Sequence, residues 1–382
     1  MGFHEFSSPY DWSRIAAYKR TAKAAFGGMI DLSVGSPVDP VPDSVRKALA
    51  VAANDPNAYG YPATAGTADL RAAIAEWFSA ARNVDLQAIH ADVVPTVGSK
   101  EGVALMASLL HFGEDDVVVQ PKVSYPTYEI GTQLAGAQVL KVDDVADVAS
   151  WRNVPGVKAV WVNSPCNPTG EVYSAERMAG IVAAAREIGA VALSDECYAL
   201  MQWRGATNSA DDDPLQSTPC ALRSDVCAGS AEGVLVLYSL SKQSNMAGYR
   251  TAFIAGDESL IASMSAYRKQ IGQIIPGPVQ AAMAAGLRDL ESVKVQHARY
   301  RERLGVLVSA LRAYGYCTDM PDGALYVWVR AKSGDCWTDM EQLAKIGIIA
   351  SPGEFYGAPE CLRFSATASD EAIASAAERL AR

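Results

Sequence analysis

The chain has few of the side chains that bind metal ions or build disulfide frameworks. Only four histidines occur among 382 residues, and none stands at a metal-ligand spacing from another. The seven cysteines are odd in number, scattered and without a C-x-x-C pair, so they are expected to be reduced thiols. The sequence therefore predicts neither a disulfide-stabilised fold nor a metal site.

Long apolar runs and basic clusters are also missing. No run of about 18 apolar residues occurs, and the N-terminal residues lack the apolar core of a signal peptide, which favours a cytoplasmic protein that does not enter a membrane. A net charge of −10 without a basic stripe argues against a nucleic-acid partner. Hydrophobic residues make up 49% and charged residues 20%, as in ordinary globular proteins.

Short apolar strands alternate with amphipathic helices between residues 93 and 255. The expected strands are Val93–Val97, Val117–Gln120, Gln138–Val142, Ala159–Asn163, Ala190–Ser194, Val234–Tyr238 and Thr251–Ala255. Helices are expected at Ser99–Phe112 and at Ser174–Ile188, the second with Ser174 as its N-cap. This alternation predicts an α/β fold whose mostly parallel, seven-stranded sheet is sandwiched by helices.

The pattern changes after Pro276-Gly-Pro278. A connector helix is expected at about residues 279–315, as Val279–Leu290 and Glu291–Ala313. Beyond it, strands are expected at Ala324–Arg330, Ile348–Ala350 and Cys361–Ser365, and helices at Asp339–Ile346 and Asp370–Leu380. We therefore expect a large domain of residues 41–280 and a smaller α+β domain of residues 1–40 with 281–382.

Two further segments complete this outline. The first is Asp31–Val34, which is strand-like and is expected to join the smaller domain. Residues 204–232 are expected to form a long polar excursion. Its three consecutive aspartates, Asp211–Asp213, are more typical of a solvated loop than of a metal site.

The segment Ser239-Leu-Ser-Lys-Gln-Ser-Asn-Met-Ala-Gly-Tyr-Arg250 follows one of the apolar strands. A primary amine such as that of Lys242 can form a Schiff base with a carbonyl cofactor, while hydroxyl and guanidinium groups bind phosphate. Taken alone, Lys242 and Arg250 are better explained as ordinary surface charges near a strand end. Lysine, hydroxyl and arginine together nevertheless suggest pyridoxal 5′-phosphate (PLP).

Two other strand ends carry polar groups that suit the same cofactor. Asn163-Ser-Pro-Cys-Asn-Pro-Thr-Gly170 is a turn-rich loop that presents the Asn167 amide at the edge where α/β sheets bind ligands. In Ser194-Asp-Glu-Cys-Tyr198, a carboxylate at Asp195 would keep a pyridine nitrogen protonated, and the Tyr198 hydroxyl would contact a phenolate oxygen. A plain turn and a helix-capping aspartate explain each loop separately but not both together.

Weaker signals come from two more loops. Val97-Gly-Ser-Lys-Glu-Gly102 joins a strand to a helix, so the backbone N–H groups of Ser99 and Lys100 form a possible phosphate site. In Ser124-Tyr-Pro-Thr-Tyr128, Tyr125 stands where a ring could stack on a planar cofactor, although a pair of core tyrosines is the stronger interpretation of this loop.

Together these segments resemble the class I/II aminotransferases, which are fold-type I PLP enzymes, over nearly the whole chain and in the right order. The resemblance implies that Lys242 binds PLP covalently and moves the proton in catalysis, with Asp195 and Tyr198 as its catalytic partners. The other residues that it implies for cofactor binding are Ser99, Lys100, Tyr125, Asn167, Ser239 and Arg250.

The same resemblance implies a substrate site and a dimer. Arg363, in Cys361-Leu-Arg-Phe-Ser365, would bind the substrate α-carboxylate as a bidentate fork, beside Asn167 and the close-approach glycine Gly35. With the carboxylate held in this way, the Cα–H bond is the one that breaks. Tyr61 matches the tyrosine that family members lend to the cofactor phosphate of the neighbouring subunit, so a homodimer is expected.

Within the family, the closer resemblance is to the actinobacterial-type N-succinyldiaminopimelate aminotransferases of lysine and cell-wall biosynthesis. Among the strings that carry it are Leu32-Ser-Val-Gly-Ser-Pro-Val-Asp-Pro40, Gly60-Tyr-Pro-Ala-Thr-Ala-Gly-Thr67 and Pro352-Gly-Glu-Phe-Tyr-Gly357. The implied donor is N-succinyl-L,L-diaminopimelate and the acceptor 2-oxoglutarate. Cys166 and Ser36 depart from the usual residues, and neither is expected to touch the chemistry.

The absence of one cation favours an N-succinyldiaminopimelate aminotransferase over an aspartate aminotransferase. The segment Gly272-Gln-Ile-Ile-Pro-Gly-Pro278 has no arginine for a distal carboxylate, and the nearest cations are Arg268 and Lys269. A long, amide-containing substrate would instead use Gln273 and other polar groups. Broader-specificity aminotransferases acting on aspartate, alanine or aromatic amino acids remain an alternative, as does a cystathionine-type C–S lyase. A PLP-binding regulator is disfavoured because only about 30 residues precede Asp31.

Overall fold

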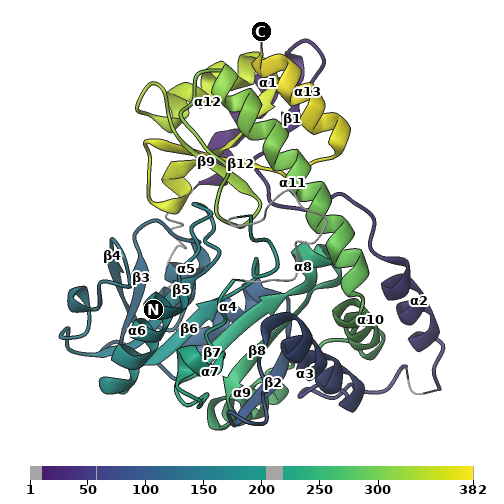
Figure 1. Ribbon diagram of the computed structural model, residues 1–382, viewed down its shortest axis with the longest axis vertical. Coiled ribbons are helices and arrows are strands. Elements are labelled where there is room, and N and C mark those ends of the chain that lie inside the picture. Colours follow the sequence, from purple (N-terminus) through teal and green to yellow (C-terminus); the bar gives the residue numbers. More distant parts are fainter. Residues whose placement is uncertain (1–10, 57, 204–217, 382) are drawn as a thin grey trace, which may run out of the picture. The chain divides into compact units, whose positions relative to one another are not determined.

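The computed structural model describes residues 11–56, 58–203 and 218–381, which divide into two compact units (Figure 1). The large unit comprises residues 36–301 and 322–324, and the small unit comprises the residues up to 35 together with 302–321 and those from 325 onward. The domain boundaries expected from the sequence, 40/41 and 280/281, assign the whole connector helix to the small domain. The connector α11 (Leu290–Ala313) instead contributes to both units, since the division falls at 301/302.

A seven-stranded sheet forms the centre of the large unit (Figure 1). Its strands, in the order β2-β8-β7-β6-β5-β3-β4, are β2 (Ala91–Val97), β8 (Thr251–Asp257), β7 (Val234–Ser239), β6 (Val191–Asp195), β5 (Val157–Asn163), β3 (Val117–Pro121) and β4 (Gln138–Val142). Every neighbouring pair is parallel except the two that involve β8, which runs antiparallel to β2 and to β7. This confirms the predicted mostly parallel sheet.

Helices cover both faces of this sheet. Their bounds are α2 (Asp43–Ala52), α3 (Ala68–Arg82), α4 (Ser99–Leu109), α5 (Thr127–Leu134), α6 (Ala175–Glu187), α7 (Ser224–Cys227), α8 (Leu240–Gln243), α9 (Glu258–Gln270) and α10 (Gly277–Arg288), with short 3-10 turns η2 (Val148–Ser150) and η3 (Ala247–Tyr249). The apolar side chains of α3, α6 and α10 join one core cluster, and those of α4, α5 and α9 join another.

Strand β7 shows why the sheet must be covered twice. All six of its residues are buried, and their side chains alternate between the two clusters: Val234, Val236 and Tyr238 belong to one, and Leu235 and Leu237 to the other. A strand that is apolar on both faces is typical of a parallel sheet inside two helical layers. Each such side chain contributes about 1.5–3 kcal/mol on burial.

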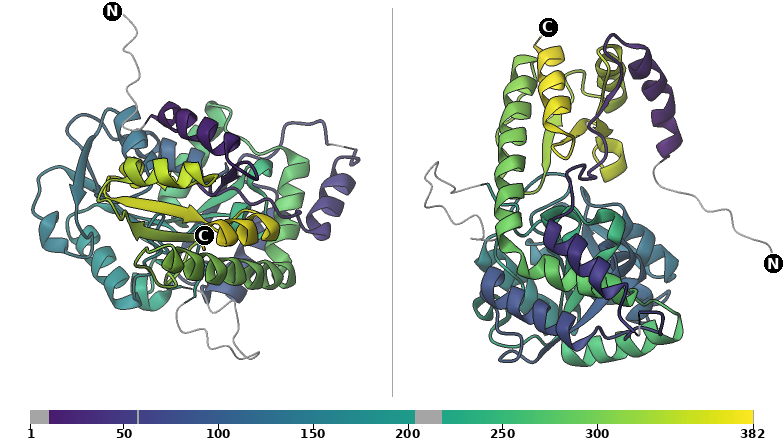
Figure 2. Two further views of the ribbon diagram at one scale, coloured as in Figure 1. Left: turned by 90° about the horizontal axis from the view of Figure 1, so that it is seen from above. Right: turned by 90° about the vertical axis from the view of Figure 1, so that its right-hand side faces the viewer.

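The small unit combines two small sheets with helices. Antiparallel strands β11 (Ser351–Pro352), β12 (Cys361–Ser365) and β9 (Tyr326–Arg330) form one, and parallel strands β1 (Ile30–Asp31) and β10 (Ile348–Ile349) form the other. Around them lie η1 (Trp12–Arg14), α1 (Ile15–Ala24), α12 (Cys336–Lys345), η4 (Gly353–Tyr356) and α13 (Asp370–Leu380). Figure 2 shows α13 alongside the C-terminal half of α11, where Arg303 pairs with Asp370 at 2.6 Å.

Most predicted elements lie within two or three residues of the observed ones. Ser174 is the predicted N-cap of α6, and its hydroxyl accepts a hydrogen bond of 3.3 Å from the N–H of Arg177. The strand expected at Asp31–Val34 is wrong in its bounds: only Ile30 and Asp31 pair with β10, because the Asp31 carboxylate then turns the chain by accepting from the N–H of Ser33 at 3.0 Å. The aspartates Asp211–Asp213 lie outside the described residues. Within the described part of the chain, no helix has the length and apolarity to cross a membrane.

Candidate active site

The predicted cofactor residues of the large unit gather at one edge of its sheet. Strands β2, β3, β5, β6 and β7 all run in the same direction, so their carboxyl ends share this edge. Strand β8 runs the opposite way and begins there. At these strand ends, after them, or before β8 are Ser99, Lys100, Tyr125, Asn167, Asp195, Tyr198, Ser239, Lys242 and Arg250. Ligands of open α/β sheets bind at this edge.

Lys242 lies on the four-residue helix α8, directly after β7. Ser239 caps this helix, because its buried hydroxyl accepts from the N–H of Ser241 at 3.1 Å and donates to the Thr251 carbonyl at 3.2 Å. The hydroxyl therefore ties the end of β7 to the start of β8, and the direction in which the chain leaves β7 is fixed. The Lys242 side chain is half-buried.

The edge between β2 and β8 brings a helix N-terminus and an arginine together. Here α4 begins at Ser99 after Gly98, whose φ of +78° suits glycine. A Cβ at Gly98 would overlap the guanidinium of Arg250, so only glycine allows this arginine to lie against the helix N-terminus. The Arg250 guanidinium donates to the carbonyls of Ala247 at 2.8 Å and Val97 at 3.4 Å. The N–H groups of a helix N-terminus and a guanidinium together favour an anion.

A buried carboxylate marks the end of β6. Asp195 is 6% exposed; its Oδ2 accepts from the Tyr128 hydroxyl at 2.7 Å and its Oδ1 from the N–H of Cys197 at 3.2 Å. Burial raises the pKa of this carboxyl above its ordinary value, although both hydrogen bonds act to lower it. No ion pair involving Asp195 is found among the described residues. A cationic ring N–H would therefore suit this carboxylate, which fits the pyridine nitrogen of PLP.

The loop after β5 is attached to the same aspartate through its backbone. The Asn163 side chain donates to the Asp195 carbonyl at 2.9 Å, and its oxygen accepts from the N–H of Asn167 at 2.8 Å. The Asn167 and Tyr198 side chains are both buried, at 6% and 7% exposure. Asn163 thus couples the position of Asn167 to that of Asp195, a role that the sequence did not suggest.

A fully buried ion pair lies at the next position along the chain from Asp195. Glu196 and Arg82 of α3 are 1% and 0% exposed and bond to each other. The Glu196 Oε1 also accepts from the Ser194 hydroxyl at 2.9 Å and from the N–H of Ala221 at 2.8 Å. Sequence reasoning missed this pair, because Arg82 stands 114 residues before Glu196 and nothing local connects them.

A second ion pair lies behind the first turn of α4. The completely buried Arg268 of α9 binds Glu101 at 2.9 Å. Burial raises the pKa of Glu101, and the arginine opposes this rise. Arg268, which the sequence offered as one of the nearest cations to the 272–278 segment, is therefore engaged inside the large unit.

In the small unit, Arg363 on β12 is 4% exposed. Its guanidinium donates to the Ser33 carbonyl at 2.7 Å and lies 4.0 Å from the ring centre of Tyr326 and 4.8 Å from that of Tyr356. These contacts set the plane of the fork. A Cβ at Gly35 would overlap the Tyr326 hydroxyl, so the close approach predicted at Gly35 is one to this tyrosine.

Two exposed tyrosines lie on the loop before α3, outside these groups. Tyr61, predicted to serve a neighbouring subunit, is 102% exposed, and Tyr59 nearby is 90% exposed. Neither ring is buried against the described residues of its own chain.

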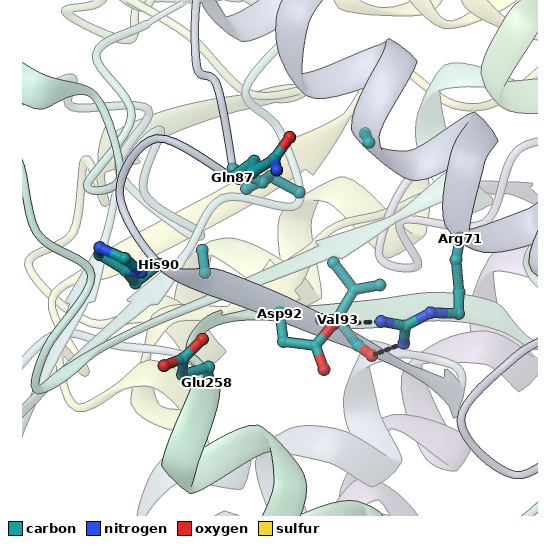
Figure 3. Close-up of a pocket in the computed structure, with 9 residues that line it drawn as sticks. Arg71, Gln87, His90, Asp92, Val93 and Glu258 are labelled. Atoms are coloured by element: carbon teal, nitrogen blue, oxygen red, sulfur yellow. Dashed lines mark hydrogen bonds and ion pairs between the residues drawn. The ribbon is translucent and has the colours of Figure 1, made fainter.

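A pocket elsewhere on the large unit contains none of the predicted site residues (Figure 3). It has a volume of about 320 Å³ and lies between α3, β2 and the start of α9. The Arg71 guanidinium in its wall bonds to the Asp92 carboxylate and, at 2.8 Å, to the Val93 carbonyl. The charge of Arg71 is therefore neutralised by the pocket wall itself.

The fold and the sheet edge together define an α/β protein equipped for a phosphorylated, pyridine-containing cofactor. A family model described as "Aminotransferase class I and II" matches residues 27–380. The chain belongs to this family, whose members depend on PLP, and it is a PLP-dependent aminotransferase.

Curated relatives and solved structures agree with this assignment. The chain is 40% identical to 4-dedimethylamino-4-oxo-anhydrotetracycline transaminase OxyQ of Streptomyces rimosus, over 97% of this chain and 98% of that protein. It is 39% identical to a probable aminotransferase of Mycobacterium tuberculosis, over 97% and 84%. A structure of a probable N-succinyldiaminopimelate aminotransferase from Thermus thermophilus superposes with a TM-score of 0.84 at 27% identity, covering 97% and 99%.

Proposed function

We propose that this aminotransferase transfers the amino group of N-succinyl-L,L-diaminopimelate to 2-oxoglutarate, with N-succinyl-2-amino-6-oxopimelate and glutamate as products. The similarity to the Thermus thermophilus protein named for this substrate supports the proposal. Several relatives at 28–29% identity are named LL-diaminopimelate aminotransferases. The substrate in their name is the same molecule without the succinyl group, and this likeness also supports the proposal.

The observation that carries this substrate is the ion pair of Arg268, one of the two cations nearest to the segment Gly272–Pro278. That segment contains no lysine or arginine. Arg268, just before it, is completely buried and bound to Glu101, so it cannot also serve a short dicarboxylic substrate. The half-buried Gln273 offers an amide for hydrogen bonding, as a succinylamide requires.

When bound, PLP supplies an electron sink for the pair of electrons left by the broken Cα–H bond. We assign the ring-nitrogen contact to Asp195 and the phenolate-oxygen contacts to Asn167 and Tyr198. We assign the ring stack to Tyr125. The phosphate is assigned to the N–H groups of Ser99 and Lys100, the Ser239 hydroxyl and the Arg250 guanidinium.

The proton and the substrate are handled by two further side chains. The Lys242 amine takes the proton from Cα as a general base and returns it as a general acid. Arg363, its fork held in plane by Tyr326 and Tyr356, binds the α-carboxylate with two hydrogen bonds. Gly35 leaves the space that Tyr326 occupies in this arrangement.

The substrate is tested by giving the PLP-loaded enzyme one amino donor at a time, without an acceptor, and measuring the oxo product and the cofactor absorbance. N-Succinyl-L,L-diaminopimelate should react fastest, ahead of L,L-diaminopimelate, aspartate and alanine. Strong turnover of aspartate with none of N-succinyl-L,L-diaminopimelate would refute the assignment. Release of pyruvate, ammonia and thiol from cystathionine would instead identify a C–S lyase.

The 40% identity to OxyQ favours one alternative acceptor, the ketone 4-dedimethylamino-4-oxo-anhydrotetracycline in that protein's name. The same enzyme preparation, supplied with glutamate and this ketone, distinguishes the two. Amination of the ketone at a kcat/KM above that of the succinylated substrate would show that the ketone, and not the succinylated compound, is the preferred substrate.

We also propose a homodimer in which Tyr61 contacts the phosphate in the neighbouring subunit. Its complete exposure within one chain supports this, because a large aromatic ring at a specific loop then has no role inside its own subunit. Mixing Tyr61→Ala and Lys242→Ala subunits should restore activity, since each hybrid dimer contains one intact site. Unchanged low activity after verified subunit exchange would contradict the shared site.

A further inference from the structure

The structure assigns Tyr128 a positioning role: its hydroxyl holds the Asp195 carboxylate ionised and oriented toward the cofactor ring nitrogen. This inference rests on the proposed contact between Asp195 and that nitrogen. It starts from a residue whose loop the sequence interpreted as core packing.

The position of Tyr128 is fixed on several sides. It is the second residue of α5 and is 1% exposed. Its ring lies nearly parallel to that of Trp161 on β5, with 4.5 Å between centroids and 18° between planes, and it meets the Tyr125 ring edge-on at 5.7 Å and 82°. The ring therefore has one orientation, which directs the hydroxyl to Asp195 Oδ2 at 2.7 Å.

The hydrogen bond can run in only one direction. Burial and the neighbouring Asp195 raise the pKa of Tyr128 well above its ordinary value, so the phenol keeps its proton at neutral pH. A protonated phenol facing a carboxylate is a donor. It stabilises the ionised form of Asp195, as does the N–H of Cys197 on the other oxygen, against the effect of burial.

These donors also leave the carboxylate able to accept one more. The two carboxylate oxygens have about four lone-pair sites between them, and Tyr128 and the backbone and side chain of Cys197 do not use all of these sites. A ring N–H then finds an oriented, charged acceptor. Without the Tyr128 hydroxyl, Oδ2 loses its donor inside a buried environment and the neutral form of the carboxyl becomes favoured.

The test compares Tyr128→Phe, which keeps the ring stacked on Trp161, with Tyr316→Phe. The control removes an equivalent bond in the small unit, where the buried Tyr316 hydroxyl donates to Asp339 at 2.8 Å beside two backbone N–H donors. In apoenzyme with ¹³C-labelled aspartate carboxyls, the Asp195 resonance, identified by its loss in Asp195→Asn, should titrate at higher pH in Tyr128→Phe and unchanged in Tyr316→Phe. The PLP dissociation constant should rise roughly tenfold to hundredfold in Tyr128→Phe alone, the range for one hydrogen bond to a charged group.

A double-mutant cycle decides whether the hydroxyl acts through Asp195. In the Asp195→Asn background, Tyr128→Phe should change PLP affinity less than about threefold; an undiminished effect there would overturn the inference. If Asp195→Asn itself leaves PLP affinity unchanged, the proposed ring-nitrogen contact is refuted. If Asp195→Asn weakens PLP binding but Tyr128→Phe does not, only the role of Tyr128 is refuted. Should Tyr128→Phe not fold, the hydroxyl proton of Tyr128 can be observed by NMR in apoenzyme that keeps this tyrosine. In the wild type this proton should exchange slowly with solvent, and its chemical shift should change in Asp195→Asn. Rapid exchange in the wild type would refute the hydrogen bond.

Discussion

The buried pair between Arg82 and Glu196 yields the sharpest stability prediction for this chain. Replacing Arg82 with methionine keeps most of the side-chain volume but removes the cation. The Glu196 carboxylate then keeps its neutral donors, the Ser194 hydroxyl and the N–H of Ala221, but loses its cation, in a site where it is 1% exposed. The carbonyl of Thr218, which accepts from Arg82 at 2.8 Å, loses its donor too.

The size of the effect follows from this burial. Removing one partner of a buried ion pair costs about 3–5 kcal/mol, because the remaining charge stays desolvated without compensation. Arg82→Met should therefore lower the free energy of unfolding of the large unit by about that amount. Adding Glu196→Gln removes the orphaned charge, so the double variant should regain at least about 1 kcal/mol relative to Arg82→Met.

Urea denaturation followed by tryptophan fluorescence measures these differences. The matched control is Arg288→Met, which breaks a pair with Asp69 at 2.8 Å and Glu76 at 2.7 Å whose arginine is 39% exposed. Surface pairs contribute about 0–1 kcal/mol, so this variant should be nearly as stable as the wild type. Equal losses for Arg82→Met and Arg288→Met would refute the argument from burial.

Four further outcomes are expected. Lys242→Ala should remove the visible absorption of bound PLP and nearly abolish turnover, and full activity would refute its catalytic assignment. Arg363→Ala should raise KM for amino and oxo acids at least roughly tenfold while the PLP dissociation constant, measured by titration, changes little. Gly98→Ala should weaken PLP binding roughly tenfold or more, because the methyl group displaces Arg250; a wild-type affinity would exclude this role of the glycine. Burial acts to raise the pKa of Asp339, but hydrogen bonds from Ser333 and from the N–H of Lys332 hold it below its ordinary value. The contribution of Asp339 to stability is therefore present above about pH 4 and is lost as the pH falls through the lowered pKa of the folded state. Asp339→Asn should flatten the acid limb of a curve of Tm against pH.

Sequence reasoning performed best where the signal was local. Strand β7 was predicted to within one residue because an uninterrupted apolar run that is buried on both faces has no other compact use. The residues at the sheet edge were predicted as a group for the same reason, since each follows directly from a strand end. Helix α4 ends three residues earlier than predicted, at Leu109, because His111 takes a φ of +60° that no helical periodicity indicates.

The sequence could not reveal side-chain contacts between residues that are far apart along the chain. The Tyr128 hydroxyl reaches Asp195 across 67 positions, and Arg82 reaches Glu196 across 114. In neither case does the sequence separation follow a helical or strand periodicity, so spacing gives no signal of the contact. The packing of α3 and α5 against the sheet makes these pairs neighbours, whereas the register of the sheet sets Asn163 beside Asp195.

The reversed strand β8 explains how one short segment can serve two parts of a cofactor. Lys242 follows the end of β7, and the chain then turns through η3 within eight residues to start β8 at Thr251. Because β8 is antiparallel to β7, it begins at the edge where β7 ends, and its pairing of Thr251 with Val97 brings the preceding Arg250 beside the N-terminus of α4. A parallel strand in this place would start at the opposite edge, about 20 Å away for a six-residue strand, and would separate the arginine from the lysine. The antiparallel turn therefore lets twelve consecutive residues supply both the reactive amine and a phosphate-binding guanidinium.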